Sequence, residues 1–262
     1  MIKGILNGLK TYGNSFGLVT KLGLWKYFAI PMVISLLTAA IIITAAYGFS
    51  DDIGHWVEQI WPWEWGKQAF FVFAEILSAL VIIAVGFILY KHIVMALSAP
   101  FMSPVSEKIE AHLLGTKYNP RDTTFGEQLW RGIRINVRNL SMELLLTIPI
   151  LLLSLIPLIG FISPILLFLM QAYYAGFGNM DYTLERHFTY EKSVQFVRQN
   201  KGQAIGNGIV FMLFLLIPVI GVILVLPLSV TAATKQTIGL LPPREDVKRT
   251  IEPTDPKQLN SK

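Results

Sequence analysis

The chain contains no cysteine, which excludes disulfides, thiolate metal sites and cysteine nucleophiles. It is also poor in charge, because charged residues make up 15% of its 262 residues, against about 25% in soluble domains. Hydrophobic residues make up 53% of the chain and gather in long runs. This composition leaves too little charge to cover a soluble surface, and it predicts an all-α integral membrane protein in a lipid bilayer.

Motifs for catalysis and energy coupling are also missing. The sequence has no GxxxxGK[ST] loop to hold ATP phosphates, and its four histidines are scattered. Asp181, Glu185 and His187 do not form a compact set of metal ligands. We therefore expect no catalytic residues, no enzyme activity, no cofactor and no metal. The net charge of +5 suits the cytoplasmic loops of a membrane protein, so we expect no nucleic-acid partner.

Two apolar runs have the length of ordinary membrane crossings, at residues 28–47 and 69–97. The second exceeds one crossing, so it must tilt or protrude. Between them, residues 50–67 are polar and contain a cluster of tryptophans that favour the headgroup interface: Trp56, Trp61, Trp63 and Trp65. Residues 1–27 contain four lysines and no acid, whereas the tryptophan-rich loop is acidic. This asymmetry predicts that both termini are cytoplasmic.

Residues 98–143 are more polar. The Ser98-Ala-Pro-Phe101 sequence predicts a helix break, after which Pro104 starts a new helix with one apolar face. A second polar helix is expected over residues 124–142. Neither has enough continuous apolar length to cross a bilayer, and residues 1–26 also read as amphipathic. We expect the two polar helices to lie at the membrane surface or to protrude from it.

Residues 144–177 and 204–236 form a weak internal repeat, because each contains Leu-Ile-Pro-x-Ile-Gly between apolar arms. Each segment is too short for two ordinary crossings, since these need roughly 40 apolar residues. The breaks at Pro157–Gly160 and Pro218–Gly221 favour two re-entrant helical hairpins. Four thin full spans or two long kinked helices remain the alternatives. The domain is expected to cover residues 1–241, and the polar tail 242–262 is expected to be disordered.

Several short motifs follow one another along the chain: Leu97-Ser-Ala-Pro-Phe101 with Ser106–Glu110, Ile156–Gly160 with Pro164, Asp181-Tyr182, Gly206-Asn-Gly208, Ile217-Pro218 and Pro227–Thr234. In their order and spacing they resemble the CysZ family of bacterial sulfate transporters, which is grouped with etoposide-induced protein 2.4. The resemblance implies two spanning helices, two hemi-penetrating hairpins, a homo-oligomer in the bacterial inner membrane, and sulfate entry for cysteine biosynthesis.

The resemblance has one departure. CysZ proteins have a Gly-Leu-Arg-type motif before the first span, and its arginine is implicated in sulfate binding. This sequence reads Gly23-Leu24-Trp25-Lys26, so Trp25 stands where the family has arginine. Lys26 can supply positive charge, but it lacks the bidentate fork that suits an oxyanion.

Three sets of residues are candidates for an anion path. The backbone N–H groups of Gly23 and Leu24, together with Lys26, are the first, although Lys26 can equally be an interfacial lysine. Three arginines at i, i+3 and i+7 are the second, and they suit either an anion vestibule or lipid phosphates. The hairpin tips are the third, where glycine either admits an ion or only permits the turn. The second and third sets are Arg131, Arg134 and Arg138, and Pro157, Gly160, Pro218 and Gly221.

Two functions from different classes follow. The first is a permease that moves sulfate or a related oxyanion into the cytoplasm, channel-like or secondary, without ATP hydrolysis by this chain. The second is a membrane scaffold or biogenesis protein with no translocated solute, which the replacement of the family arginine by Trp25 keeps open.

Overall fold

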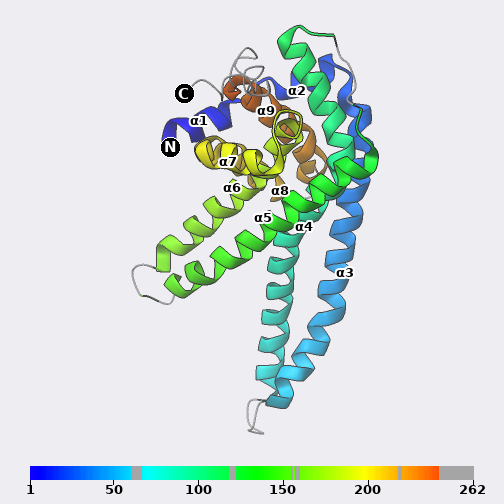
Figure 1. Ribbon diagram of the computed structural model, residues 1–262. Coiled ribbons are helices and arrows are strands. Elements are labelled where there is room, and N and C mark those ends of the chain that lie inside the picture. The colour runs from blue at the N-terminus through cyan, green and yellow to red at the C-terminus, as the bar shows by residue number, and fades with distance from the viewer. Residues whose placement is uncertain (61–66, 118–121, 155, 157–159, 218–219, 242–262) are drawn as a thin grey trace, which may run out of the picture.

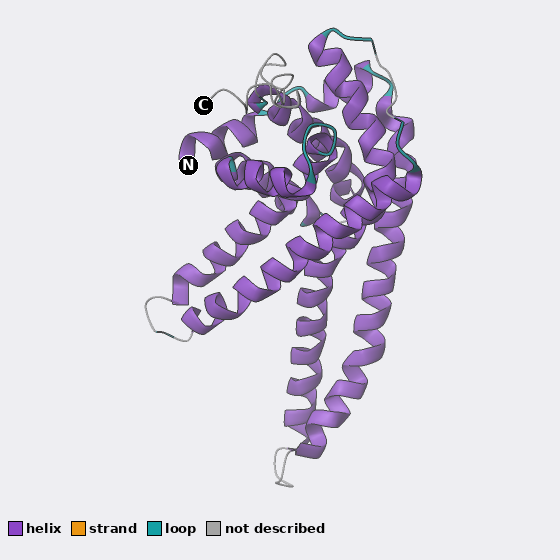
Figure 2. Ribbon diagram, viewed as in Figure 1, coloured by secondary structure: helices purple, strands orange, loops and turns teal. Residues whose placement is uncertain are grey.

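The computed structural model describes residues 1–60, 67–117, 122–154, 156, 160–217 and 220–241. Every regular element in these ranges is helical (Figures 1 and 2). Two short 3-10 helices cover Leu24–Phe28 and Gly160–Ile162. The α-helices are α1 (Ile2–Lys10), α2 (Ser15–Lys21), α3 (Ala29–Ile60), α4 (Lys67–Leu114), α5 (Phe125–Ser154), α6 (Ser163–Leu184), α7 (Tyr190–Gln199), α8 (Lys201–Leu215) and α9 (Ile220–Leu240). The tail predicted to be disordered, 242–262, lies outside the described residues.

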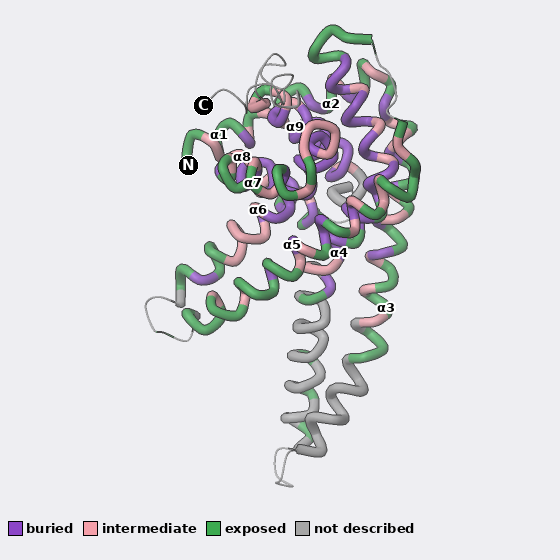
Figure 3. The backbone as a smooth tube through the Cα atoms, in the orientation of Figure 1, coloured by how far each residue is buried: buried purple, intermediate pink, exposed green. Residues whose placement is uncertain are grey.

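Two helical hairpins diverge from a common core in Figure 1, one built by α3 and α4 and the other by α5 and α6. α8 and α9 lie in the core, where α8 packs against α1, α6 and α9. Figure 3 shows that buried residues concentrate in this core, while the outer part of α5 is largely exposed. The core therefore joins the two hairpins, and their far ends extend away from it.

Among the described residues, three helical segments are long and apolar enough to cross a membrane: Leu24–Phe49, Ile88–Leu114 and Phe125–Leu153. The first contains the predicted span at residues 28–47. Only 22% of the apolar window is buried inside the chain in the first and third segments, against 67% in the second. The first and third therefore present apolar side chains outward, as lipid contact requires, whereas the second is largely a core helix.

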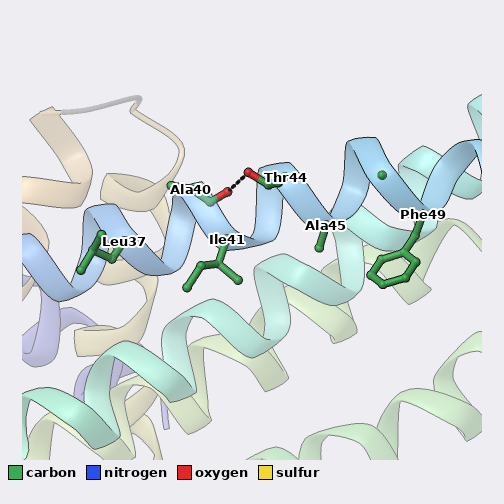
Figure 4. A pocket seen from close by; sticks show the side chains of 7 residues that line it. Leu37, Ala40, Ile41, Thr44, Ala45 and Phe49 are labelled. Atoms are coloured by element: carbon green, nitrogen blue, oxygen red, sulfur yellow. Dashed lines mark hydrogen bonds between the residues drawn. The ribbon is translucent and has the colours of Figure 1, made fainter.

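α3 has an apolar outer surface with a shallow groove of about 570 Å³ (Figure 4). Leucine, isoleucine and phenylalanine side chains border small residues along it, and the lining residues are Leu37, Ala40, Ile41, Thr44, Ala45, Gly48 and Phe49. The Thr44 hydroxyl donates to the Ala40 carbonyl at 2.8 Å, so its polarity is satisfied within the helix. Such a surface suits contact with lipid tails.

Two predicted helix boundaries are wrong. The first-span helix does not end near Tyr47, because α3 continues to Ile60. The Ser98–Phe101 segment does not break the helix, because α4 is continuous from Lys67 to Leu114 and contains two prolines. The Ser103 hydroxyl donates to the Ala99 carbonyl at 3.0 Å. Burial of this stretch of α4 outweighs the local cost of proline, about 3 kcal/mol.

The predicted C-terminal boundary of the helix over residues 124–142 is also wrong. α5 continues through Met142 and Pro149 to Ser154, so the polar helix and the first hairpin arm are one helix of 30 residues. By contrast, α8 has only 15 residues, about 22 Å, which is short of a hydrocarbon core of about 30 Å. The hairpin predicted over residues 204–236 therefore has the short first arm that the sequence predicts. The hairpin predicted over residues 144–177 does not.

Glycines let α8 approach its neighbours very closely. A Cβ on Gly206 would collide with the backbone of α1 at Ile5 and Gly8, and one on Gly208 would collide with the Ala172 carbonyl of α6. Small residues at such crossings are typical of helices that pack without a hydrophobic driving force in lipid. α8 is thus clamped between the N-terminal helix and α6.

Candidate functional site

Gly23 forms the turn that leads into the first candidate span. Its φ of 60° and ψ of 34° lie in the left-handed region, which favours glycine, and it precedes the 3-10 helix Leu24–Phe28. The Gly23 N–H donates to the Thr20 carbonyl at 3.1 Å, so this donor is already engaged. The Leu24 side chain is buried in the core, whereas Lys26 is exposed. The turn therefore presents Lys26 outward beside the start of the span.

A second lysine, distant in sequence, joins Lys26. Lys108 of α4 donates from Nζ to the Tyr27 hydroxyl at 2.6 Å. The Nζ atoms of Lys26 and Lys108 lie 5.4 Å and 4.6 Å from the centroid of the Tyr27 ring. Two ammonium groups therefore converge on one ring and concentrate positive charge there. The sequence did not reveal this cluster, because no local spacing links Lys108 to Tyr27.

At the position where the family has an arginine, the Trp25 side chain packs against neighbouring residues. Its Nε1 donates to the Thr20 hydroxyl at 3.1 Å. Its ring meets Phe16 and Phe28 edge-on, with centroids 5.3 Å and 6.3 Å apart. The indole thereby joins α2 to the start of the span, and it contributes no charge.

Arg131, the first arginine of the predicted stripe, is fully engaged inside the chain. Its Nε and Nη2 donate to the two Asp181 oxygens at 3.1 Å and 2.9 Å, a bidentate pair. Nη2 also donates to the Ser193 hydroxyl at 2.8 Å, and Nη1 donates to the Phe188 carbonyl at 3.2 Å. Arg131 therefore fastens α5 to α6 and to the start of α7.

The other two arginines have weaker partners. The Arg134 guanidinium lies 4.0 Å from the Tyr190 ring centroid, and its Nη2 is 3.6 Å from a Glu191 oxygen. Arg138 donates from Nη1 to the Asn139 side-chain oxygen at 3.0 Å and lies 5.5 Å from the Phe177 ring centroid. Among the described residues, Arg138 pairs with no carboxylate. Arg138 is thus the arginine of the stripe whose charge is most available to an anion.

The predicted hairpin tips are described only in part. Pro157 and Pro218 lie outside the described residues. Gly160 begins the 3-10 helix Gly160–Ile162, and Gly221 is the second residue of α9. The described helices begin at Gly160 and Ile220, and the predicted breaks before them lie outside the described residues.

A buried charged network joins α4 to α5. Lys91 donates from Nζ to Glu143 Oε1 at 2.7 Å, and neither side chain is exposed to solvent. His92 contacts Glu143 Oε2 through Nε2 at 3.0 Å and the Asn136 side-chain oxygen through Nδ1 at 3.3 Å. Asn136 donates to the Gly132 carbonyl at 2.9 Å. Sequence reasoning missed this network, although a lysine and a histidine ending an apolar run are a signal for buried partners.

A second network joins α4 to the end of α6. Arg186 donates from Nε and Nη2 to one Glu110 oxygen at 2.9 Å and 2.8 Å, and from Nη2 to the Ser106 hydroxyl at 2.8 Å. His187 Nε2 lies 3.0 Å from the other Glu110 oxygen. Ser106 further contacts the Thr234 hydroxyl of α9 at 3.0 Å. Within the residues that the structure describes, no group of three possible ligands could hold a metal ion.

A third polar contact set ties the N-terminal helices to the core. The Tyr12 hydroxyl donates to the Asn207 carbonyl of α8 at 2.9 Å, and burial raises the pKa of that hydroxyl, so it stays a donor. Asn179 of α6 donates to the Asn207 side-chain oxygen at 3.0 Å. Lys235 of α9 donates from Nζ to the carbonyls of Thr11 and Gly13 at 3.1 Å and 2.8 Å. The end of α1 is therefore held by α8 and α9 together.

Comparison with known proteins identifies relatives along most of the chain. The profile of the family described as sulfate transporter CysZ/etoposide-induced protein 2.4 matches residues 12–226. A protein named sulfate transporter CysZ from Pseudomonas fluorescens (strain Pf0-1) is 27% identical over 237 residues, which cover 88% of this chain and 92% of the relative. Its namesake from Pseudomonas aeruginosa (strain LESB58) is 26% identical over 236 residues, with 87% and 93% covered. One from Vibrio parahaemolyticus is 29% identical over 166 residues, with 62% and 67% covered.

Proposed function

The chain belongs to the sulfate transporter CysZ/etoposide-induced protein 2.4 family, and from this premise we propose that it moves sulfate or a related oxyanion across the bacterial inner membrane into the cytoplasm. The observation that carries the proposal is the extent of the match, since residues 12–226 include both helical hairpins and most of the core. Relatives named as sulfate transporters align over nearly their whole length. The missing ATP-binding loop favours a channel-like or secondary mechanism.

The cluster of Lys26, Lys108 and Tyr27 supports a site where the anion first binds. Two ammonium groups near one ring, beside the first candidate span, provide charge that a dianion needs when it leaves water. Neither lysine offers the paired N–H groups of arginine, so recognition there rests on charge more than on fixed geometry. Gly23 and Leu24 shape the adjacent turn, and Arg138 offers a further cation on α5.

The arrangement in the membrane is part of the proposal. We take α3 and α4 to cross the bilayer and the α8–α9 hairpin to enter and leave by one face, because α8 reaches only about 22 Å. We take the α5–α6 hairpin to do the same at a steep tilt, because in Figure 1 it diverges from the α3–α4 pair. Both termini would then be cytoplasmic, and copies of the chain would assemble to complete the path.

Sulfate uptake into proteoliposomes tests the function. The wild-type chain should take up labelled sulfate above empty vesicles, with competition by sulfite or thiosulfate reporting selectivity. Lys26→Ala and Lys108→Ala should each lower sulfate affinity measured by calorimetry. Lys117→Ala is the matched control, because Lys117 is exposed and lies away from Tyr27. If all three variants bound sulfate with the same affinity, the lysine cluster would not be part of the sulfate site.

A scaffold without a translocated solute is the second candidate. Two observations favour it: Trp25 provides packing where the family has arginine, and Arg131 is consumed by partners inside the chain. The same assay separates the two functions. A folded oligomer that takes up no sulfate above empty vesicles would exclude the permease and leave the scaffold.

The topology has its own test. The chain lacks cysteine, so single cysteines can be introduced without background. Cysteines at Lys201 and Leu240, the two ends of the α8–α9 hairpin, should react with an impermeant reagent from the same side. Labelling from opposite sides would show that this hairpin crosses the bilayer completely.

A further inference from the structure

The first 50 residues contain no aspartate or glutamate, and their charged side chains are all lysines: Lys3, Lys10, Lys21 and Lys26. All four are exposed. Lys3 and Lys10 make no side-chain hydrogen bond or ion pair with any described residue. The N-terminal helices therefore present positive charge that no acidic side chain among the described residues neutralises.

α1 has two distinct faces. Gly4 and Gly8 meet the backbone of α8, where added Cβ atoms would lie 3.2 Å and 2.8 Å from the Cα atoms of Gly202 and Gly206. Helical spacing places Lys3 and Lys10 on the opposite face. Beside them, Ile2 and Leu6 are 72% and 49% exposed. The outward face of α1 thus combines uncovered apolar side chains with lysines.

The position of this face points to the membrane surface. α2 ends at Lys21, and the first candidate span begins three residues later at Leu24. α1 and α2 are therefore tied to the level at which that span leaves the hydrocarbon. Phe16 of α2 is 57% exposed and packs edge-on against Trp25, an aromatic pair typical of the headgroup interface. Amphipathic helices with lysines beside exposed apolar residues bind in that interface.

We propose that the outward face of α1 and α2 binds anionic phospholipid headgroups, with Ile2 and Leu6 among the acyl chains and Lys3 and Lys10 beside the phosphates. The four lysines and the absence of acid select anionic over zwitterionic lipid. Bound lipid also stabilises the α8–α9 hairpin. The reason is that α1 packs against α8 through glycines, and Lys235 of α9 binds the turn that follows α1. Of the four lysines, Lys26 alone also belongs to the proposed sulfate site, and the variants tested below leave it unchanged.

The charge is tested by titrating phosphatidylglycerol, and phosphatidylcholine in parallel, into the detergent-solubilised full chain while following its thermal midpoint. Phosphatidylglycerol should raise the midpoint at lower concentration than phosphatidylcholine. Each lysine beside an anionic surface contributes roughly five-fold in affinity, so Lys3→Gln with Lys10→Gln should weaken the response by up to about 25-fold. Lys117→Gln with Lys192→Gln is the matched control, because it removes the same charge from exposed lysines elsewhere. Equal weakening in both double variants would overturn the proposal, as would the same midpoint rise with soluble glycerol phosphate.

The insertion is tested with an environment-sensitive fluorophore on a single cysteine, at Leu6→Cys or at its neighbour Asn7→Cys, in nanodiscs that contain phosphatidylglycerol. Helical spacing turns Asn7 about 100° away from Leu6. The probe at position 6 should be blue-shifted and quenched by spin-labelled lipid, and the probe at position 7 should be neither. Equal quenching at both positions would overturn the proposed face. Disulfide-linked dimers of the unlabelled Leu6→Cys chain, together with no lipid quenching of the labelled chain, would assign the face to a second copy of the chain and also overturn the proposal.

Discussion

Replacing Glu143 with glutamine is expected to destabilise the folded chain by about 3–5 kcal/mol, because it leaves a buried lysine without its counterion. Glu143 is 0% exposed and receives Lys91 Nζ at 2.7 Å on one oxygen and His92 Nε2 at 3.0 Å on the other. Lys91 is also 0% exposed, so no solvent replaces the lost carboxylate charge. The glutamine can still accept a hydrogen bond, which makes the variant a test of charge at nearly constant volume.

The measurement is reversible unfolding in mixed micelles with increasing dodecyl sulfate, followed by circular dichroism. Glu191→Gln is the control, because it breaks an ion pair with Arg134 whose side chains are 72% and 52% exposed and whose atoms are 3.6 Å apart. Such exposed pairs contribute about 0–1 kcal/mol. The two variants remove the same charge, and they differ chiefly in burial.

A double-mutant cycle completes the argument. Lys91→Met and Glu143→Met alone should each destabilise the chain, because the first leaves Glu143 with His92 only and the second leaves Lys91 without its counterion. Lys91→Met combined with Glu143→Met should recover much of the loss, since replacing a whole buried ion pair by apolar residues is often near neutral. A loss below about 1 kcal/mol for Glu143→Gln, or a double variant as unstable as the sum of the two single ones, would refute the buried-pair reasoning.

Three further predictions rest on other contacts. Gly208→Ala should prevent α8 from seating on α6 and lower the yield of folded chain in detergent gel filtration, whereas Gly126→Ala, with nothing within 4 Å of its Cβ position, should leave it unchanged. Arg131→Lys should destabilise the chain by about 1.5–3 kcal/mol, because lysine cannot hold Asp181 bidentately, and protease cleavage near α7 should accelerate. Trp25→Arg should tighten sulfate binding in calorimetry, because it restores the family's cation, and unchanged affinity would argue against an anion site at that turn.

Helix content and membrane character were predictable from local pattern. Long apolar runs identify a membrane helix whatever surrounds them, and the span at residues 28–47 lies within the candidate span Leu24–Phe49. The short first arm of the second hairpin was predictable for the same reason, because length is a property of the run itself. Helix ends were less predictable. The prolines at 100 and 104 predict a break, but the helix continues because its neighbours bury it.

The candidate site was predictable only where its residues are close in sequence. Gly23, Leu24 and Lys26 form one short motif at the start of the first candidate span, where Lys26 is exposed but the Gly23 N–H already donates to the Thr20 carbonyl. The three arginines of the stripe all lie on α5, but their partners were not visible in the sequence: Arg131 meets Asp181, 50 residues away. The spacing of arginines in the sequence does not show whether an arginine already pairs with a carboxylate in the fold or can still bind an anion.

The sequence by itself determined that this chain is a helical membrane protein of the CysZ/etoposide-induced protein 2.4 family, because hydropathy, run length and ordered motifs are local properties that survive without a fold. Only the tertiary structure decided which charges meet. Lys91 and Glu143 are 52 residues apart, and Lys108 reaches Tyr27 across 81 residues. These pairs depend on how helices cross, and the crossings are set by close backbone contacts such as Gly208 against Ala172, which no linear pattern specifies.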